Sequence, residues 1–225
     1  MNRTHLTLRI NHWSNKADKA METMILYCPW DWYAAQKAYE YARIILKKRW
    51  IEGEKKIIKN PHYSYMYARH VIQGRWPEAE KIIASRCDSG YLYAKYVVKG
   101  RFEEVEKNKN WELKDLYLYC KYVLKSRWKE VENKLFKKDK TYFDSEYFVK
   151  YARDFIKGRW EKAESYIVNS RHIAQYAEIL NEEDKESFHN KVLAQSLVDT
   201  RKHYYYNYAQ EYIKNLKTKP VQDIL

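Results

Sequence analysis

The 225-residue sequence is short of the features that several large protein classes need. It has only five glycines and four prolines, too few for the Gly-rich phosphate loops of an ordinary α/β enzyme or the tight turns of a β-barrel. Its three cysteines are odd in number and lack metal-type spacing, which favours a reducing compartment over a disulfide scaffold. There is no apolar run near the ~20 residues that cross a bilayer and no signal-peptide apolar segment. These absences predict a soluble, intracellular helical protein that makes no membrane contact.

Catalytic and metal-binding patterns are missing as well. The seven histidines show no paired ligand spacing with cysteine or carboxylate. The sequence contains no G-x-S-x-G, Walker or G-x-G-x-x-G motif, and no pattern singles out an acid–base pair among the 30 acidic residues. We predict from this that the protein is not an enzyme and binds no metal or cofactor.

Tyrosine is what the sequence has in excess, with 23 copies beside eight tryptophans. Without tyrosine the hydrophobic fraction falls to roughly 35%, which is thin for a compact protein. The core must therefore be built largely from tyrosine and tryptophan, whose rings are apolar and whose O–H and N–H groups need polar partners. Trp30 and Trp32 lie at a predicted helix start, where they are either packed or exposed as an anchor.

An internal repeat organises the chain. Five copies align on an arginine followed by an aromatic residue, and two weaker copies follow at Tyr176 and Tyr208. The arginines of the clear copies are spaced by 26, 26, 26 and 32 residues. The copies are Tyr41–Ile57, Tyr67–Ile83, Tyr93–Lys109, Tyr119–Leu135 and Tyr151–Ile167.

Each copy predicts two short antiparallel helices. Its first half places tyrosine, alanine and two aliphatic residues on one helical face. Gly74, Gly100 and Gly158 then suit the left-handed residue that ends a helix, and Pro77 suits the first position of the next one. Because isolated helices this short are marginal in water, the pairs must stack on one another.

The predicted fold is therefore all-α, an α-solenoid of short antiparallel helix pairs with about 26 residues per repeat. Residues 1–40 form a helical N-terminal cap, residues 41–175 the repeats, and residues 176–225 degenerate repeats with a C-terminal cap. No Gly/Ser/Pro-rich linker interrupts the chain, so we predict one continuous domain over 1–225.

A glutamate follows each repeat arginine by five residues. One hypothesis is a ladder of arginines for phosphate groups. The structural interpretation is stronger: the arginine bonds helix-end carbonyls, the glutamate complements the next helix dipole, or the two pair with each other. The arginines are Arg49, Arg75, Arg101, Arg127 and Arg159, and the glutamates Glu54, Glu80, Glu106, Glu132 and Glu164.

The net charge of +13 is concentrated in two lysine-rich segments, residues 41–66 and 119–150. Lysines interleaved with aromatic rings are typical of single-stranded nucleic-acid binding, whereas a solvated surface is the alternative. Tyrosines near the C-terminus are either a protein interface or packing around the cap. The candidate partner-binding residues are Lys55, Lys56, Lys59, Lys134, Lys137, Lys138, Lys140, Tyr142, Tyr204, Tyr205 and Tyr206.

The second clear copy, Tyr67–Glu80, resembles the tandem YAxxVIxGRWPEAE repeat of uncharacterised helical repeat proteins of tailed bacteriophages. The resemblance covers about residues 41–167 and supplies no active site. Lys48 and Ser126 replace the glycine of the pattern, and Phe102 replaces the tryptophan. The resemblance implies a phage origin and a location in the host bacterial cytoplasm.

These observations favour a non-catalytic protein that binds and inhibits a bacterial host protein, such as a defence-system nuclease or effector, in the manner of an anti-CRISPR protein. The target could itself be a nucleic-acid-bound defence complex. One alternative is a nucleic-acid-binding repeat protein that uses the lysine-rich segments. Another is a sponge for an anionic signal nucleotide.

Overall fold

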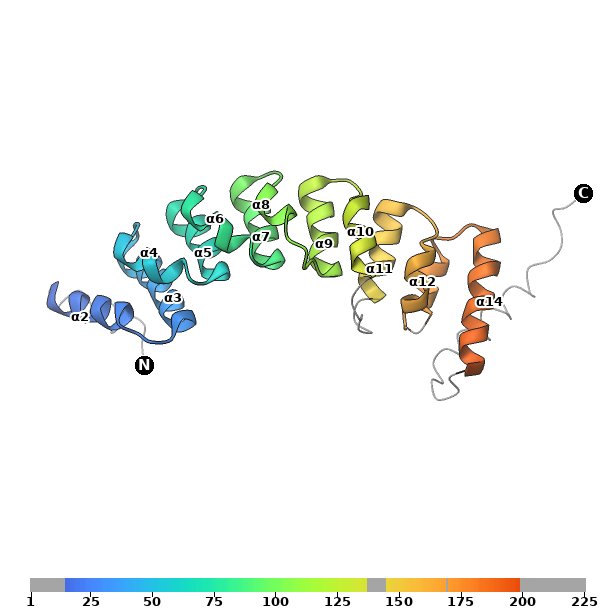
Figure 1. Cartoon of the computed structure of the whole chain (residues 1–225), viewed down its shortest axis with the longest axis horizontal. Coiled ribbons are helices and arrows are strands. Elements are labelled where there is room, and N and C mark those ends of the chain that lie inside the picture. The colour runs from blue at the N-terminus through green and yellow to red at the C-terminus, as the bar shows by residue number, and fades with distance from the viewer. Residues whose placement is uncertain (1–14, 137–144, 169, 199–225) are drawn as a thin grey trace, which may run out of the picture. The chain divides into compact units, whose positions relative to one another are not determined.

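The structure is a computed structural model that describes residues 15–136, 145–168 and 170–198. Within these ranges every regular element is a helix (Figure 1), which confirms the all-α prediction. The chain forms two compact units, Met1–Asn110 with Tyr122–Leu124, and Trp111–Lys121 with Lys125–Leu225. Each unit is described by itself, and the single continuous domain stays a prediction.

The first unit is built from helix pairs that follow one another along the chain (Figure 1). In each pair a longer helix, whose last turn is π-helical, is followed by a short α-helix. The elements are α2 (Asn15–Leu26), α3 (Asp31–Glu40) with η1 (Tyr41–Leu46), α4 (Ile51–Ile57), α5 (Pro61–Tyr67) with η2 (Ala68–Ile72), α6 (Pro77–Ile83), α7 (Cys87–Tyr93) with η3 (Ala94–Val98), and α8 (Glu103–Glu106).

The second unit repeats the same pairing and ends on a longer helix. Its elements, together with the η4 segment shared between the two units, are α9 (Leu113–Tyr119) with η4 (Cys120–Leu124), α10 (Lys129–Leu135), α11 (Ser145–Tyr151) with η6 (Ala152–Ile156), α12 (Glu161–Ile167), α13 (Ile173–Ala177) and α14 (Glu182–Val198). The predicted helix pair is thus present in all five copies of the repeat.

The end of each first helix differs from the prediction by one residue. The left-handed residue is Lys47, Gln73, Lys99, Lys125 or Lys157, and no described glycine has a positive φ. The assignment of this role to Gly74, Gly100 and Gly158 was therefore wrong. The reason is the wide π-helical turn, in which the carbonyl of the motif alanine accepts bonds from the two residues that end the helix.

Tyrosine forms the core, as the composition predicted. Six of the largest fully buried side chains are tyrosines, and five of these are motif tyrosines or their degenerate counterpart. Each motif ring packs against the aromatic residue that follows the arginine in its own repeat; Tyr67 and Trp76, for example, have ring centroids 5.1 Å apart. The buried tyrosines are Tyr65, Tyr67, Tyr93, Tyr119, Tyr151 and Tyr176.

The repeat arginine and glutamate pair with each other in every copy. In the second copy Arg75 Nε and Nη2 donate to the two carboxylate oxygens of Glu80, each over 2.7 Å. The same two-bond geometry joins the other pairs, Arg49–Glu54, Arg101–Glu106, Arg127–Glu132 and Arg159–Glu164. The bidentate pair that the sequence left open is thus what the structure contains.

A tyrosine from the next repeat completes this pair. Tyr93 Oη accepts from the backbone N–H of Trp76 over 2.7 Å and donates to Glu80 Oε1 over 2.9 Å. The same link joins Tyr67 to Trp50, Tyr151 to Trp128 and Tyr176 to Trp160. We call this arginine, glutamate, tyrosine and backbone N–H set the seam, because it ties one repeat to the next.

Candidate functional site

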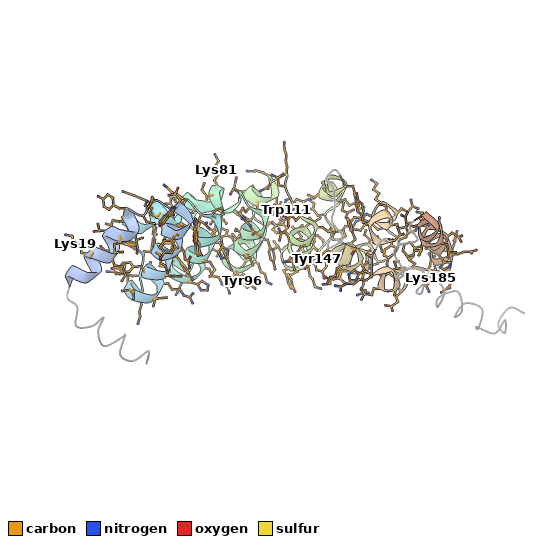
Figure 2. The ribbon with its side chains drawn as sticks, turned by 90° about the horizontal axis from the view of Figure 1, so that it is seen from below. Lys19, Lys81, Tyr96, Trp111, Tyr147 and Lys185 are labelled. Atoms are coloured by element: carbon orange, nitrogen blue, oxygen red, sulfur yellow. The ribbon has the colours of Figure 1, made fainter. Side chains whose placement is uncertain are left out.

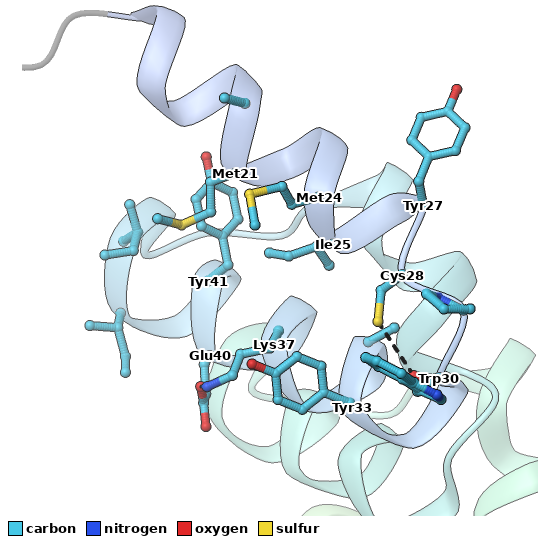
Figure 3. Close-up of a pocket in the computed structure, with 15 residues that line it drawn as sticks. Met21, Met24, Ile25, Tyr27, Cys28, Trp30, Tyr33, Lys37, Glu40 and Tyr41 are labelled. Atoms are coloured by element: carbon cyan, nitrogen blue, oxygen red, sulfur yellow. Dashed lines mark hydrogen bonds and ion pairs between the residues drawn. The ribbon is translucent and has the colours of Figure 1, made fainter.

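An open apolar groove lies between α2 and the α3–η1 helix in the first unit. Its volume is about 900 Å³. Figure 3 shows Met21, Met24 and Ile25 projecting from α2 toward Tyr33 and Tyr41 on the opposite wall. The groove is therefore walled by the side chains of two helices that lie close together in sequence.

The local sequence explains both walls. Met24 and Ile25 follow Met21 by three and four residues, so all three share one side of α2. Ile25 is buried under this helix, whereas Met24 stays 75% exposed. Pro29 follows the end of α2, and the chain reverses there because proline cannot continue a helix.

The polar groups at the groove are already paired with each other. Lys37 Nζ lies 2.7 Å from Glu40 Oε2, and Gln36 Nε2 donates to Glu40 Oε1 over 2.8 Å. The bond from Lys37 holds the pKa of Glu40 below its usual value. Tyr41 Oη donates to Glu22 over 3.1 Å. The groove thus offers an apolar surface with a neutralised rim.

Large apolar side chains continue outward from the groove. Trp30 is 65% exposed and Trp32 is 61% exposed, which favours the anchor over the packing interpretation of this pair. Tyr27, another residue that lines the groove, is also exposed. Contiguous exposed apolar surface of this kind is rare on monomers and marks interaction sites, and tryptophan and tyrosine are frequent energetic hot spots.

Two of the lysines predicted to bind a partner have other contacts. Lys56 Nζ donates to the Cys28 carbonyl over 3.1 Å, and Lys59 Nζ lies 2.9 Å from Asp31 Oδ1. These bonds fasten the end of α4 and the residues just after it to the turn before α3 and to the first residue of α3, and therefore support a groove wall. Lys55 is exposed on α4.

The remaining predicted partner-binding residues lie outside what the structure describes. Lys134 belongs to α10, but its side chain is outside the described part of the chain. Seven further residues lie entirely outside the described part of the chain: Lys137, Lys138, Lys140, Tyr142, Tyr204, Tyr205 and Tyr206. Their roles stay predictions.

The sequence did not single out Met21, Met24 and Tyr27. The signal was present in the three-residue spacing of the methionines next to the Trp30 and Trp32 pair. What sequence could not show is that α2 leaves part of the α3–η1 surface uncovered.

The described residues contain no cluster of three or more histidine, cysteine or carboxylate side chains that could hold a metal ion. Over the same residues, no helix is both long and apolar enough to cross a membrane. The side chains that line the groove are mostly apolar, a lining typical of sites that bind apolar groups.

No protein-family model, curated protein or solved structure matches this chain. The similarity to tailed-phage repeat proteins therefore stays a prediction from the repeat motif alone.

Proposed function

We propose that this protein is a non-catalytic helical-repeat protein that binds another protein through the groove between α2 and α3–η1. The observation that carries the proposal is the exposure of large apolar side chains at that groove: Met24 and Trp30 line it, and the exposed Trp32 contacts the groove residue Tyr33. Such a patch costs solvation free energy when it faces water, and a docked partner recovers it.

The occupant we propose is an amphipathic helix of the partner. Within the first unit, α3 and η1 pack on one side against α5 and η2, whereas α2 covers part of the other side. The uncovered strip thus has the form that a helix fills elsewhere in the same unit. Because the rim charges of Lys37 and Glu40 are paired, the partner helix is expected to present apolar anchors at helical spacing.

The repeats serve as a scaffold for this site. We propose that they stack as an α-solenoid, because the same tyrosine-to-backbone link recurs from repeat to repeat inside each unit. The phage-type repeat suggests a host bacterial protein as the partner, with inhibition of a defence nuclease or effector as the outcome. This last step depends on the motif resemblance and on no measured contact.

The test compares the wild-type protein with two variants used as baits, each of which places a charge at an exposed apolar residue. Met24→Glu alters the groove, and Ile51→Glu is the matched control, because Ile51 is exposed on α4 and does not line the groove. Each bait is incubated with nuclease-treated bacterial lysate and the bound proteins are identified by mass spectrometry. We expect one stoichiometric protein to be retained by the wild type and by Ile51→Glu and lost by Met24→Glu.

Three results would overturn the proposal. The first is an identical set of proteins on all three baits. The second is self-association abolished by Met24→Glu in sedimentation velocity, which would make a second copy the occupant. The third is a captured protein that binds more tightly when residues 1–14 are deleted and whose binding is unchanged by Met24→Glu.

A further inference from the structure

A second surface of the first unit carries an ordered set of cations. Two residues after the motif tyrosine stand Arg43, Arg69 and Lys95, and six residues after it stand Lys47 and Lys99. In the first and third repeats the inner cation stands in the π-helical turn, and the outer lysine is the left-handed residue that ends it. We call these five residues the basic face. It lies on the longer helices, and Figure 2 shows Tyr96 of this helix set on the opposite edge from Lys81 of α6.

Tyrosine hydroxyls hold the inner cations of the basic face in place. Arg43 Nη1 donates to Tyr39 Oη over 2.7 Å, and Arg69 Nη1 donates to Tyr65 Oη over 2.6 Å. The Arg69 guanidinium also lies 3.8 Å from the centroid of the Tyr96 ring in the next repeat. Because the cations are fixed before any ligand arrives, less side-chain entropy is lost on binding.

No carboxylate neutralises these cations among the residues that the structure describes. Arg43, Arg69 and Lys95 have phenol oxygens as partners, and the nearby Glu40 is taken up by Lys37 and Gln36. In the second unit one equivalent cation, Lys121, lies 3.0 Å from Asp154, and the other, Arg153, donates to the backbone carbonyl of Gln175. Among the described residues, the inner cations of the basic face are thus paired with phenols and not with carboxylates.

The outer lysines occupy a backbone conformation that favours other residues. Lys47 and Lys99 have φ values of 55° and 57°, where a side chain costs folding free energy and glycine does not. Glycine instead stands one residue later, at Gly100, where a Cβ would meet no atom within 4 Å. Lysine also complements the helix dipole at this end. Its charge projects to solvent beside that of Lys95.

We propose that the basic face binds the phosphate backbone of single-stranded nucleic acid. The cations follow from one repeat to the next, since η1 contacts η2 and η2 contacts η3, as a polymer of phosphates requires. The half-buried His70 lies among the cations and provides a surface for an unstacked base, whereas the ring of Tyr96, which is 38% accessible, is stacked under Arg69 and holds that cation in place. The tyrosine rings beneath the cations are buried, so they orient charge and do not stack with bases.

The test uses full-length protein and a fluorescein-labelled oligo(dT) of about 20 nucleotides, a length that spans more than one binding site of this kind. Fluorescence anisotropy is measured between about 50 and 200 mM salt. Arg43→Gln with Arg69→Gln removes two charges from the basic face. Lys81→Gln with Lys107→Gln removes two charges from equivalent exposed positions, six residues after the seam arginines Arg75 and Arg101, and is the matched control.

We expect the Arg43 and Arg69 pair to weaken binding at least tenfold and to reduce the salt slope by about 1.4, which is two phosphate contacts. The control pair should change affinity less than about twofold. Equal losses from both pairs would overturn the proposal, as would a larger loss from Lys81 and Lys107 or an absence of salt-dependent binding. Tighter binding of duplex of the same length would overturn the single-stranded assignment.

A second variant keeps the test independent of folding. Lys47→Gly with Lys99→Gly removes two charges and relieves two left-handed lysines. We expect a melting temperature equal to or above that of the wild type together with weaker oligonucleotide binding. Unchanged affinity in this stable variant would show that the outer lysines serve the helix ends and would remove them from the site.

Discussion

The second repeat carries two arginines that have opposite surroundings. Arg75 belongs to the seam, where both of its bonds go to the carboxylate of Glu80. Arg69, six residues earlier, belongs to the basic face, where it bonds a phenol and stacks on Tyr96. The same charged group is therefore committed to the fold at one position and left for a ligand at the other. The role of each arginine depends on which side chain it bonds, and that side chain is set by the position of the arginine in the repeat.

The largest effect is expected where the seam is deepest. Glu164 is almost fully buried and accepts from Arg159, Lys191 and Tyr176. Glu164→Ala leaves these donors without their acceptor and should lower the free energy of unfolding by about 3 kcal/mol. Urea unfolding measures it, with Glu161→Ala as the exposed control in the same helix, expected within about 0.5 kcal/mol. Equal effects from the two glutamates would contradict the seam.

The tyrosine link gives the next largest effect. Tyr93→Phe keeps the ring and removes the hydroxyl that bridges Trp76 N–H and Glu80, so a buried N–H loses its acceptor. We expect a loss of about 2 kcal/mol in the free energy of unfolding. Tyr96→Phe, which removes a hydroxyl from the exposed basic face, should cost less than about 0.5 kcal/mol. A near-neutral Tyr93→Phe would show that the seam contributes little.

Acid should weaken the seam before it affects the basic face. The bond from Arg75 is the main cause that holds the pKa of Glu80 below its usual value. A lowered folded-state pKa gives stability that is complete above the unfolded-state pKa and is lost as pH falls through the folded-state pKa. The melting temperature should therefore decrease as the pH drops below about 4.5. The Glu80→Gln variant should show a smaller decrease. A pH profile unchanged by Glu80→Gln would argue against the pair.

The smallest effect tests the helix ends. Lys99 is left-handed and Gly100 is not, so Lys99→Gly should raise the free energy of unfolding by up to about 1 kcal/mol. Gly100→Ala places its methyl group in open space and should be neutral or slightly stabilising, within about 1 kcal/mol. Thermal unfolding of the two variants decides the matter. A destabilised Lys99→Gly with a stabilised Gly100→Ala would mean that the dipole term exceeds the strain.

Sequence alone predicted the features that recur. The helix pairs and the tyrosine-rich core follow from a periodic pattern in which local preferences and packing agree. The pairing of Arg75 with Glu80 was one of several interpretations that the sequence left open, and the structure selects it. The left-handed residue was missed by one position, because a π-helical turn adds a residue that an α-helical register does not count.

The candidate site was harder to predict, since it depends on what is left uncovered. The groove exists because α2 covers only part of α3 and η1, which no spacing in the sequence reveals. Lys56 and Lys59 carry charge in the sequence but are tied to Cys28 and Asp31 in the structure. Arg69 is part of the repeat motif in the sequence. Only its lack of a carboxylate partner among the described residues distinguishes it from Arg75.

The most direct test of the difference between the seam and basic-face arginines compares Arg69→Gln with Arg75→Gln. Each removes one guanidinium from the same repeat, and the affinity for labelled oligo(dT) is measured for both at a temperature where both are folded. This difference predicts weaker binding for Arg69→Gln and wild-type affinity for Arg75→Gln, with the larger loss of stability in Arg75→Gln. Equal loss of affinity in the two variants, or a loss confined to Arg75→Gln, would contradict it.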